Sequence, residues 1–223
     1  MPALLDLEDL HFAYPGRPNV LSGATLQLHA GERLCVTGAN GAGKSTLLRM
    51  VVGLLKPGGG RVVAFGTERR LEADFHEVRR RCGLVFQDPD DQLFCPTVAE
   101  DVAFGPLNLG RDRGQALAIV DDVLAQMDLM HLRDRITHKL SGGEKRLVAL
   151  AAVLAMAPDV LLLDEPTGGL DEANEARLAS ILLDLPQAMI VVSHDAGFRA
   201  RMATRSVHLA DGRLATSDLR SHG

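Results

Sequence analysis

The fold is decided by the stretch Gly38-Ala39-Asn40-Gly41-Ala42-Gly43-Lys44-Ser45, which matches the phosphate-binding pattern GxxxxGK[ST] in full. Its glycines let backbone N–H groups turn toward phosphate oxygens, and the helix predicted after them aims its N-terminus at the same anion. We expect Lys44 to reach the β- and γ-phosphates of a nucleotide and Ser45 to ligate Mg²⁺ through its hydroxyl. By itself the stretch indicates a nucleoside triphosphatase.

Short apolar runs and helical periodicity alternate on either side of this loop. Apolar runs without a polar alternation are typical of strands in a parallel sheet covered on both faces, so the pattern predicts an α/β fold with a mostly parallel sheet. The predicted strands are Arg33–Thr37, Gly83–Phe86, Val160–Leu163 and Met189–Val192, and the predicted helices are Lys44–Leu55, Gly114–Met127, Gly143–Met156 and Glu172–Leu183.

The middle of the chain differs from its two ends. Residues 91–157 carry helical periodicity and few strand candidates, so we interpret them as a helical lobe inserted into an α/β core formed by residues 1–90 and 158–223. Together they are expected to form one domain of 223 residues. Clusters of Pro and Gly predict turns at Tyr14–Pro18, Lys56–Gly60 and Phe104–Gly110.

Polar residues follow the predicted strands at their carboxyl ends, where open α/β sheets bind ligands. After the run Val160–Leu163, Asp164 is placed to hold Mg²⁺ and Glu165 to orient and deprotonate an attacking water. An exposed acidic turn is the alternative, and the phosphate loop favours the functional interpretation. Gln87 and His194 also follow strands. They are either ordinary surface residues, or an amide near Mg²⁺ and a neutral imidazole near the γ-phosphate.

The composition restricts the class of partner. A net charge of −5 disfavours nucleic acid, because proteins that bind phosphate backbones are usually basic. Three cysteines without CxxC spacing indicate reduced thiols of a cytosolic protein. The apolar run Leu147–Ala157 is shorter than the roughly 18–20 residues that span a bilayer, and acidic residues interrupt the N-terminus where a secretory signal would lie. A membrane role would therefore need another chain to cross the bilayer.

A second motif, Leu140-Ser141-Gly142-Gly143-Glu144, opens a predicted helix. Ser141 fits an N-cap and the glycines leave backbone amides exposed, as at many helix starts. With the phosphate loop and the acidic pair, the motif closely resembles the LSGGQ or LSGGE signature of ABC-transporter nucleotide-binding subunits. The resemblance covers nearly the whole chain. It implies an ATPase that uses ATP and Mg²⁺, with a phosphate-loop core, an N-terminal antiparallel β portion and an inserted helical subdomain.

The resemblance also assigns roles to individual residues. It implies that Tyr14 stacks on adenine and that Asp171 belongs to the loop crossing between subunits. Catalysis is assigned to Glu165, His194 and Gln87, and Mg²⁺ ligation to Ser45, Gln87 and Asp164. The ATP contacts are assigned to Tyr14, Gly38, Ala39, Asn40, Gly41, Ala42, Gly43, Lys44, Ser45 and Thr46.

In this family two subunits pack head to tail, and each nucleotide lies between the phosphate loop of one subunit and the signature of the other. Ser141, Gly142, Gly143 and Glu144 are therefore expected to serve the nucleotide of a partner. That partner is either a second copy of the chain or a paralogous ATPase. Both half-sites are intact by motif, so a homodimer would hold two competent sites.

The segment from Phe86 to Pro106 closely resembles the energy-coupling-factor importers, especially the ATPases of cobalt and nickel uptake. This implies two membrane partners, a transmembrane coupling protein and a substrate-capturing protein, with the chain peripheral at the cytoplasmic face of the cell membrane. The segment after Gln87 would then line the groove that receives coupling helices. The alternatives are an ordinary loop, vitamin import by the same machinery, or a soluble ABC ATPase acting on DNA or ribosomes.

Three departures from the family pattern bear on the dimer. The signature ends in Glu144 where Gln is commoner, and the crossing loop carries Gly168-Gly169 where many relatives have Ser-Ala. The extra glycine is expected to loosen communication between subunits. Many cobalt-type ATPases have a longer C-terminal region, so a dimer contact from such a region is expected to be absent.

Overall fold

The computed structural model describes residues 2–217 and contains a six-stranded sheet that is parallel in all but its last strand. The strand order is β10-β9-β3-β8-β7-β6, with β10 antiparallel to β9. The strands are β3 (Arg33–Thr37), β6 (Cys82–Val85), β7 (Val160–Asp164), β8 (Ala188–Val192), β9 (Arg205–Ala210) and β10 (Arg213–Ser217). Each predicted strand is present within one residue of its expected bounds, which confirms the parallel sheet. Residues 218–223, where the absence of a dimer contact was expected, lie outside the described residues.

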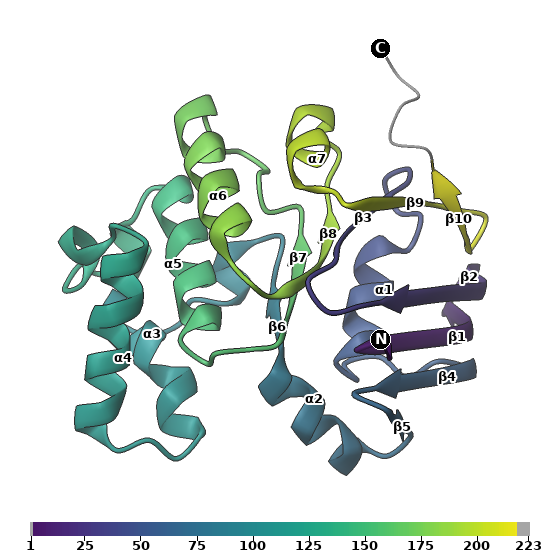
Figure 1. Ribbon diagram of the computed structural model, residues 1–223, viewed down its shortest axis with the longest axis horizontal. Helices are drawn as coiled ribbons and strands as arrows, with labels where there is room; N and C mark the ends of the chain where they lie inside the picture. Colours follow the sequence, from purple (N-terminus) through teal and green to yellow (C-terminus); the bar gives the residue numbers. More distant parts are fainter. Residues whose placement is uncertain (1, 218–223) are drawn as a thin grey trace.

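A second, antiparallel sheet lies beside the first and has the order β2-β1-β4-β5 (Figure 1). Its strands are β1 (Leu5–Tyr14), β2 (Arg17–Leu28), β4 (Gly59–Ala64) and β5 (Thr67–Arg69). This is the expected N-terminal antiparallel portion. A two-residue turn, Pro15-Gly16, joins β1 to β2, so Tyr14 and Arg17 become cross-strand neighbours.

The helices of the middle region gather on the side of the sheet away from the antiparallel strands (Figure 1). This region contains α3, α4 and α5, and no strand is assigned between residues 98 and 154. The α-helices of the chain are α1 (Lys44–Val51), α2 (Phe75–Arg81), α3 (Val98–Asn108), α4 (Arg113–Gln126), α5 (Gly142–Leu154), α6 (Glu172–Asp184) and α7 (Ala196–Met202). None of the helices in residues 2–217 is long and apolar enough to cross a membrane.

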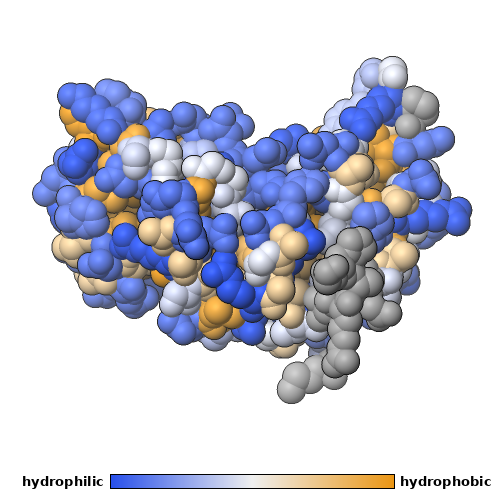
Figure 2. All heavy atoms as spheres, turned by 90° about the horizontal axis from the view of Figure 1, so that it is seen from above, coloured by the Kyte–Doolittle hydropathy of each residue, from blue (hydrophilic) through white to orange (hydrophobic). Residues whose placement is uncertain are grey.

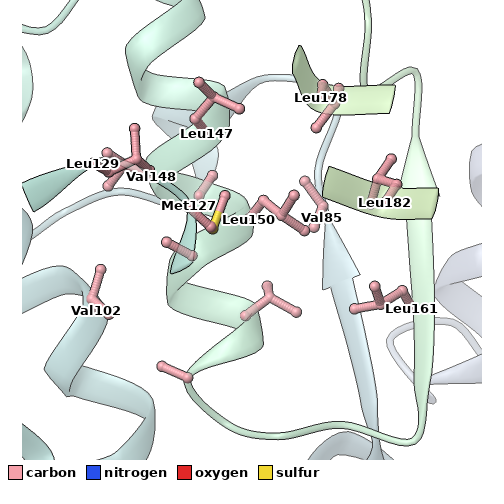
Figure 3. Packing of buried hydrophobic residues seen from close by; sticks show 14 of the residues in the cluster. Val85, Val102, Met127, Leu129, Leu147, Val148, Leu150, Leu161, Leu178 and Leu182 are labelled. Carbon is pink, nitrogen blue, oxygen red and sulfur yellow. The ribbon is translucent and has the colours of Figure 1, made fainter. Parts of the chain in front are cut away.

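The central strands are buried on both faces, as their unbroken apolar sequences predict. In β7, Leu161 and Leu163 join the core shared with α3, α4, α5 and α6, whereas Val160 and Leu162 join the core under α1 and the antiparallel sheet. Figure 3 shows Leu150 of α5 between the middle helices and the sheet. Burying one such leucine contributes roughly 1.5–3 kcal/mol. The helical region is therefore fastened to the sheet by a continuous hydrophobic core.

The predicted turn at Phe104–Gly110 is wrong, because α3 continues to Asn108. Thr97 and Glu100 form a capping box that starts this helix, and Pro106 lies in its final turn, where the missing N–H removes only one intrahelical bond. The turn itself is confined to Leu109-Gly110. Two seven-residue helices, α2 and α7, were not predicted, because each is too short to show a clear period.

Candidate nucleotide site

The phosphate loop joins the end of β3 to the start of α1 and depends on two glycines. Gly38 has φ = +145°, and a Cβ there would lie 2.4 Å from the carbonyl oxygen of Leu209 on β9. Gly43 caps α1 with φ = +107°, in the left-handed region that side chains disfavour. The loop therefore turns tightly between strand and helix, and the N-terminus of α1 faces the space that the loop encloses.

Lys44 is held inside this loop. Its side-chain Nζ donates hydrogen bonds to the carbonyls of Gly38 at 2.7 Å and Ala39 at 3.0 Å, and it lies 3.1 Å from Nε2 of His194. Burial lowers the pKa of Lys44, and the charges of Glu165 and Asp164 oppose that shift. The ammonium is thus held within the loop by the carbonyls of Gly38 and Ala39.

Ser45 and Asp164 are brought together from α1 and the end of β7. Both residues line the same pocket, the serine side chain is close enough to affect the pKa of the aspartate, and Asp164 is only 6% exposed. Burial raises the pKa of Asp164, while Ser45 and the charges of Arg49 and Lys44 lower it. The Ser45 hydroxyl and the buried Asp164 carboxylate are oxygen ligands of the kind that Mg²⁺ prefers. No group of three or more His, Cys, Asp or Glu side chains within residues 2–217 could hold a metal alone, so phosphate oxygens would complete its coordination.

Glu165 has the least usual backbone of the site, with φ = +49°. Three contacts hold it there. Its N–H donates to the carbonyl of Val192 at 2.9 Å, its carbonyl accepts from the Arg146 guanidinium at 3.2 Å, and its Oε2 accepts from the N–H of His194 at 3.2 Å. Its other oxygen, Oε1, is buried and has no hydrogen-bond donor, although Nε2 of His194 lies 3.2 Å away. Since that imidazole nitrogen also lies within reach of Lys44, we assign it as an acceptor, and Oε1 is left available.

These residues surround one open pocket of about 450 Å³ at the carboxyl ends of the strands. Figure 2 views the molecule from above, and hydrophilic residues cover most of that face. The pocket brings together many of the predicted residues, namely Tyr14, Asn40, Gly41, Gly43, Lys44, Ser45, Thr46, Gln87, Asp164, Glu165 and His194. Tyr14 is fixed at the rim, with its hydroxyl 3.2 Å from Oγ1 of Thr46 and its ring edge-on to Phe12.

Gly168 of the crossing loop lines this pocket, whereas the signature and Asp171 do not line it. The signature and the crossing loop lie next to each other. A Cβ at Gly143 would lie 3.1 Å from the side chain of Asn174 and 3.5 Å from Leu170. Asp171 caps α6 by accepting from the N–H of Asn174 at 2.8 Å. The signature residues thus do not line the chain's own nucleotide pocket, and Ser141 and Gly142 are exposed.

The structure gives a physical reason for Glu144 in the signature. Ser141 and Glu144 form a capping box at the start of α5, in which the backbone N–H of Ser141 donates to the glutamate at 2.7 Å. This backbone hydrogen bond lowers the pKa of Glu144. A glutamine could also fill the position, but the carboxylate adds a favourable charge at the helix N-terminus.

Four lining residues are not among the predicted nucleotide contacts, namely Arg17, Val20, Gly168 and Val192. The Arg17 guanidinium donates to the carbonyl of Gly41 in the phosphate loop. No local signal marks these residues, because the pairing of β1 with β2 carries Arg17 to a loop 24 positions away in the sequence.

The segment after Gln87 runs from the nucleotide pocket to an apolar groove of about 250 Å³, here called the lobe groove. Phe94 is 66% and Phe104 is 46% exposed, and their rings meet edge to face at 4.7 Å. Gln92 ties the segment to its surroundings by accepting from the N–H of Phe86 and donating to the carbonyl of Ala149. The remaining lining includes Leu54, Leu84, Val153 and Met156.

Asp101 sits behind the lobe groove and is only 4% exposed. Its Oδ1 accepts from the N–H groups of Phe94 and Cys95, both at 3.0 Å, and its Oδ2 accepts from the Thr137 hydroxyl at 3.1 Å. Thr137 lies just before the signature. One carboxylate therefore joins the groove to the segment that leads into Ser141.

Fold and site together define a phosphate-loop nucleoside triphosphatase with a second, exposed motif at the start of α5. The chain belongs to the ABC transporter family, whose model matches residues 21–168. It is an ATPase subunit, and its relatives place it in the energy-coupling-factor branch of that family.

The curated relatives are similar along nearly the whole chain. A putative ABC transporter ATP-binding protein of Brucella suis is 52% identical over 100% of this chain and 92% of its own length. The cobalt import ATP-binding protein CbiO of Rhodobacter capsulatus is 47% identical, covering 96% of this chain and 78% of CbiO. The energy-coupling factor transporter ATP-binding protein EcfA of Methanothermobacter thermautotrophicus is 42% identical, covering 95% and 69% respectively.

A solved structure shows the same architecture. It is cbiO1 from Clostridium perfringens, described as part of the ABC transporter complex cbiONQ. The TM-score is 0.86 at 34% identity, covering 96% of this chain and 88% of that one. The similarity confirms the ABC ATPase fold.

Proposed function

We propose that the chain binds MgATP in the pocket of about 450 Å³ and hydrolyses it with Glu165 as general base. The supporting observation is the buried Oε1 of Glu165, which has no hydrogen-bond donor yet borders a phosphate-binding loop. A carboxylate oxygen in that position can accept a proton from a water aimed at the γ-phosphate. The chain forms a single ATPase domain, in which the hydrophobic cluster of Figure 3 joins the α/β part to the helical lobe.

The other residues bind and orient. Lys44 and the loop amides hold the β- and γ-phosphates, while Tyr14 supports the adenine ring at the rim. Mg²⁺, when bound with the nucleotide, neutralises phosphate charge, and Ser45, Asp164 and Gln87 are its candidate ligands. His194 lines the same pocket, and once Lys44 has turned to the phosphates, the tautomer with a proton on Nε2 can donate to a γ-phosphate oxygen.

The active unit is a head-to-tail dimer with a second copy or a paralogous ATPase. Exposed Ser141 and Gly142 carry donors that no nucleotide of their own chain can use. In a dimer they would close the partner's pocket, with Asp171 and the neighbouring Gly168-Gly169 at the crossing between subunits. ATP then bridges the two chains, and hydrolysis weakens the bridge by removing the γ-phosphate link.

The lobe groove is the surface for the membrane partner. Its lining is largely apolar, and two exposed phenylalanines form one wall, which suits an amphipathic helix of a transmembrane coupling protein. The segment from Gln87 to Phe94 lines both the nucleotide pocket and this groove, so nucleotide state can reach the partner. The chain would act as a peripheral subunit at the cytoplasmic face of the membrane.

The transported cargo is proposed to be cobalt or nickel ions. The support is the likeness to the cobalt import protein CbiO and to the cbiONQ subunit. Vitamin import by the same kind of machinery is the second candidate, favoured by the likeness to EcfA, whose name specifies no cargo. A soluble ABC ATPase is the least favoured, because the lobe groove would then have no occupant.

Co-purification with the membrane fraction tests the proposal. The tagged chain should carry with it an integral membrane coupling protein and a substrate-capturing protein, and cells lacking the chain should lose uptake of radiolabelled Co²⁺ or Ni²⁺. If cells lacking the chain keep metal uptake but lose vitamin uptake, the cargo is a vitamin and not a metal ion. Retention on ribosomes or nucleic acid, without a membrane protein, would contradict the transport role.

A further inference from the structure

The β1–β2 hairpin brings two unlike side chains to the rim of the nucleotide pocket. Tyr14 ends β1 and Arg17 begins β2, and the two-residue turn makes them cross-strand partners. Arg17 bends back to the phosphate loop, where its guanidinium donates to the carbonyl of Gly41. A Cβ at Gly41 would lie 2.8 Å from Nη2 and 3.4 Å from Nη1, so the guanidinium covers the open side of that residue.

The charges around the pocket show what this contact can do. Among the residues that line it, Lys44 and Arg17 are the cations, and Asp164 and Glu165 are the anions. Lys44 is 7% exposed and lies within the loop, whereas Arg17 is exposed at the rim. Without Arg17 the lining would have a net negative charge, which opposes the binding of a polyanion.

The guanidinium also has capacity to spare. Arginine carries five N–H donors in a planar fork, and the carbonyl of Gly41 accepts from one nitrogen, Nη2. The N–H groups of the loop turn toward the phosphates, so the negative end of each peptide dipole lies at its carbonyl oxygen. The Arg17 guanidinium offsets that negative end at Gly41. Arg17 therefore reaches the pocket from the β1–β2 hairpin, whereas Lys44 reaches it from α1.

We infer that Arg17 is a nucleotide-binding residue that contacts the phosphate chain of a nucleoside di- or triphosphate through its charge. The inference rests on the proposed binding of MgATP in this pocket and adds a second phosphate cation to it. The β1–β2 hairpin then binds the nucleotide at two points, because the ring of Tyr14 stacks on the base and the guanidinium of Arg17 contacts the phosphates.

The test compares Arg17→Gln and Arg17→Lys with the wild-type chain by calorimetric titration of MgADP and of Mg²⁺ with a non-hydrolysable ATP analogue. Arg17→Gln should raise the dissociation constant about five- to tenfold, as expected for one partly solvated charge-assisted contact. Arg17→Lys should stay within about threefold of wild type. Raising the salt concentration should shrink the gap between wild type and Arg17→Gln, because the lost interaction is between charges.

Arg213→Gln is the matched control. Arg213 is also an exposed arginine that donates to a backbone carbonyl, that of Ser22, but it does not line the pocket. This variant should bind nucleotide as wild type does. Unfolding temperatures without nucleotide should be equal for all variants.

Two results would overturn the inference. One is binding by Arg17→Gln within twofold of wild type, and the other is equal weakening in the Lys and Gln variants, which would assign the effect to hydrogen-bond shape instead of charge. Absence of nucleotide binding by the wild-type chain would instead refute the proposed function itself.

Discussion

Glu165 combines a constrained backbone with a carboxylate oxygen that no donor satisfies. The left-handed φ is held by Val192 and Arg146, and the side chain is steadied through Oε2 alone. An orphaned buried acceptor costs roughly 1–3 kcal/mol in the nucleotide-free state. Leaving Oε1 of Glu165 without a donor therefore lowers the stability of the fold, and in the proposed mechanism this oxygen accepts the proton of the attacking water.

Glu165→Gln should keep MgATP binding within about twofold of wild type and lower kcat by about 10²–10⁴-fold, because the amide cannot accept a proton from water. ATP-bound dimers should accumulate in gel filtration, since the bridge is no longer hydrolysed. Steady-state kinetics and binding titration measure both effects. Glu172→Gln, which neutralises an exposed carboxylate in the first turn of α6, is the control and should hydrolyse normally. Normal turnover by Glu165→Gln would exclude it as the base.

The burial of Asp164 should make the stability of the fold depend on pH. Burial raises its pKa in the folded chain, so its ionised form destabilises the fold relative to the unfolded chain. The protonated carboxyl contributes stability that is complete below the unfolded pKa and is lost as pH rises through the raised folded pKa. Asp164→Asn should therefore raise the unfolding temperature at pH 7.5 without nucleotide.

That gain should narrow as the pH falls through the raised pKa of Asp164, because the wild-type carboxyl then becomes neutral too. The same variant should lose the stabilisation that MgATP gives to wild type. Thermal unfolding across pH, with and without MgATP, measures both. A lower unfolding temperature for Asp164→Asn at pH 7.5 would contradict the burial argument.

At the scale of elements, the start of α5 has two duties. The Ser141–Glu144 capping box stabilises the helix, and in the proposed dimer the same exposed serine would contact the partner's nucleotide. Ser141→Ala should cost about 1 kcal/mol of unfolding free energy, as caps usually do. It should also lower hydrolysis at least tenfold in the dimer without weakening MgATP binding to the same chain.

The control is Asp112→Ala, which removes the equivalent cap from α4, far along the chain from the signature. It should lose similar stability in urea unfolding and keep full hydrolysis. If Ser141→Ala hydrolyses ATP as well as Asp112→Ala does, then Ser141 serves only as a cap.

The elements could be predicted where local chemistry determines them. The phosphate loop, the parallel strands β3, β6, β7 and β8 and the position of the acidic pair follow from glycine spacing and apolar runs, whereas β9 was not among the predicted strands. The helical end of α3 could not be predicted, because its capping box and lobe packing override Pro106. Arg17 could not be predicted either, since tertiary pairing alone brings it to Gly41. The family resemblance implied a groove along the segment after Gln87, but it did not give the opposite lining, where Leu54 and Met156 come together.

At the scale of the whole molecule, two surfaces divide the work. The face at the carboxyl ends of the strands holds the nucleotide pocket, and the lobe groove lies at the other end of the segment that follows Gln87. The segment is tied down at Gln92 and Asp101. Nucleotide binding and partner binding should therefore be separable by mutation.

The double variant Phe94→Ser/Phe104→Ser should keep nucleotide binding and the unfolding temperature close to wild type, because both rings are largely exposed. It should lose the membrane coupling protein in co-purification, since two apolar anchors of the groove are gone. Leu71→Ser is the control, because Leu71 is 67% exposed and lies outside the groove. Retention of the membrane partner by the double variant would place the docking surface elsewhere.

The bonds of Asp101 have a mechanical consequence. Phe94, Cys95 and Thr137 hang on one buried carboxylate, so the groove wall and the approach to Ser141 form a stiff block. A stiff block turns as a lever. If a helix seated against Phe94 displaced the groove wall by a few ångströms, the whole block would rotate and carry the signature with it. In the proposed dimer, that rotation would open or close the nucleotide site of the partner.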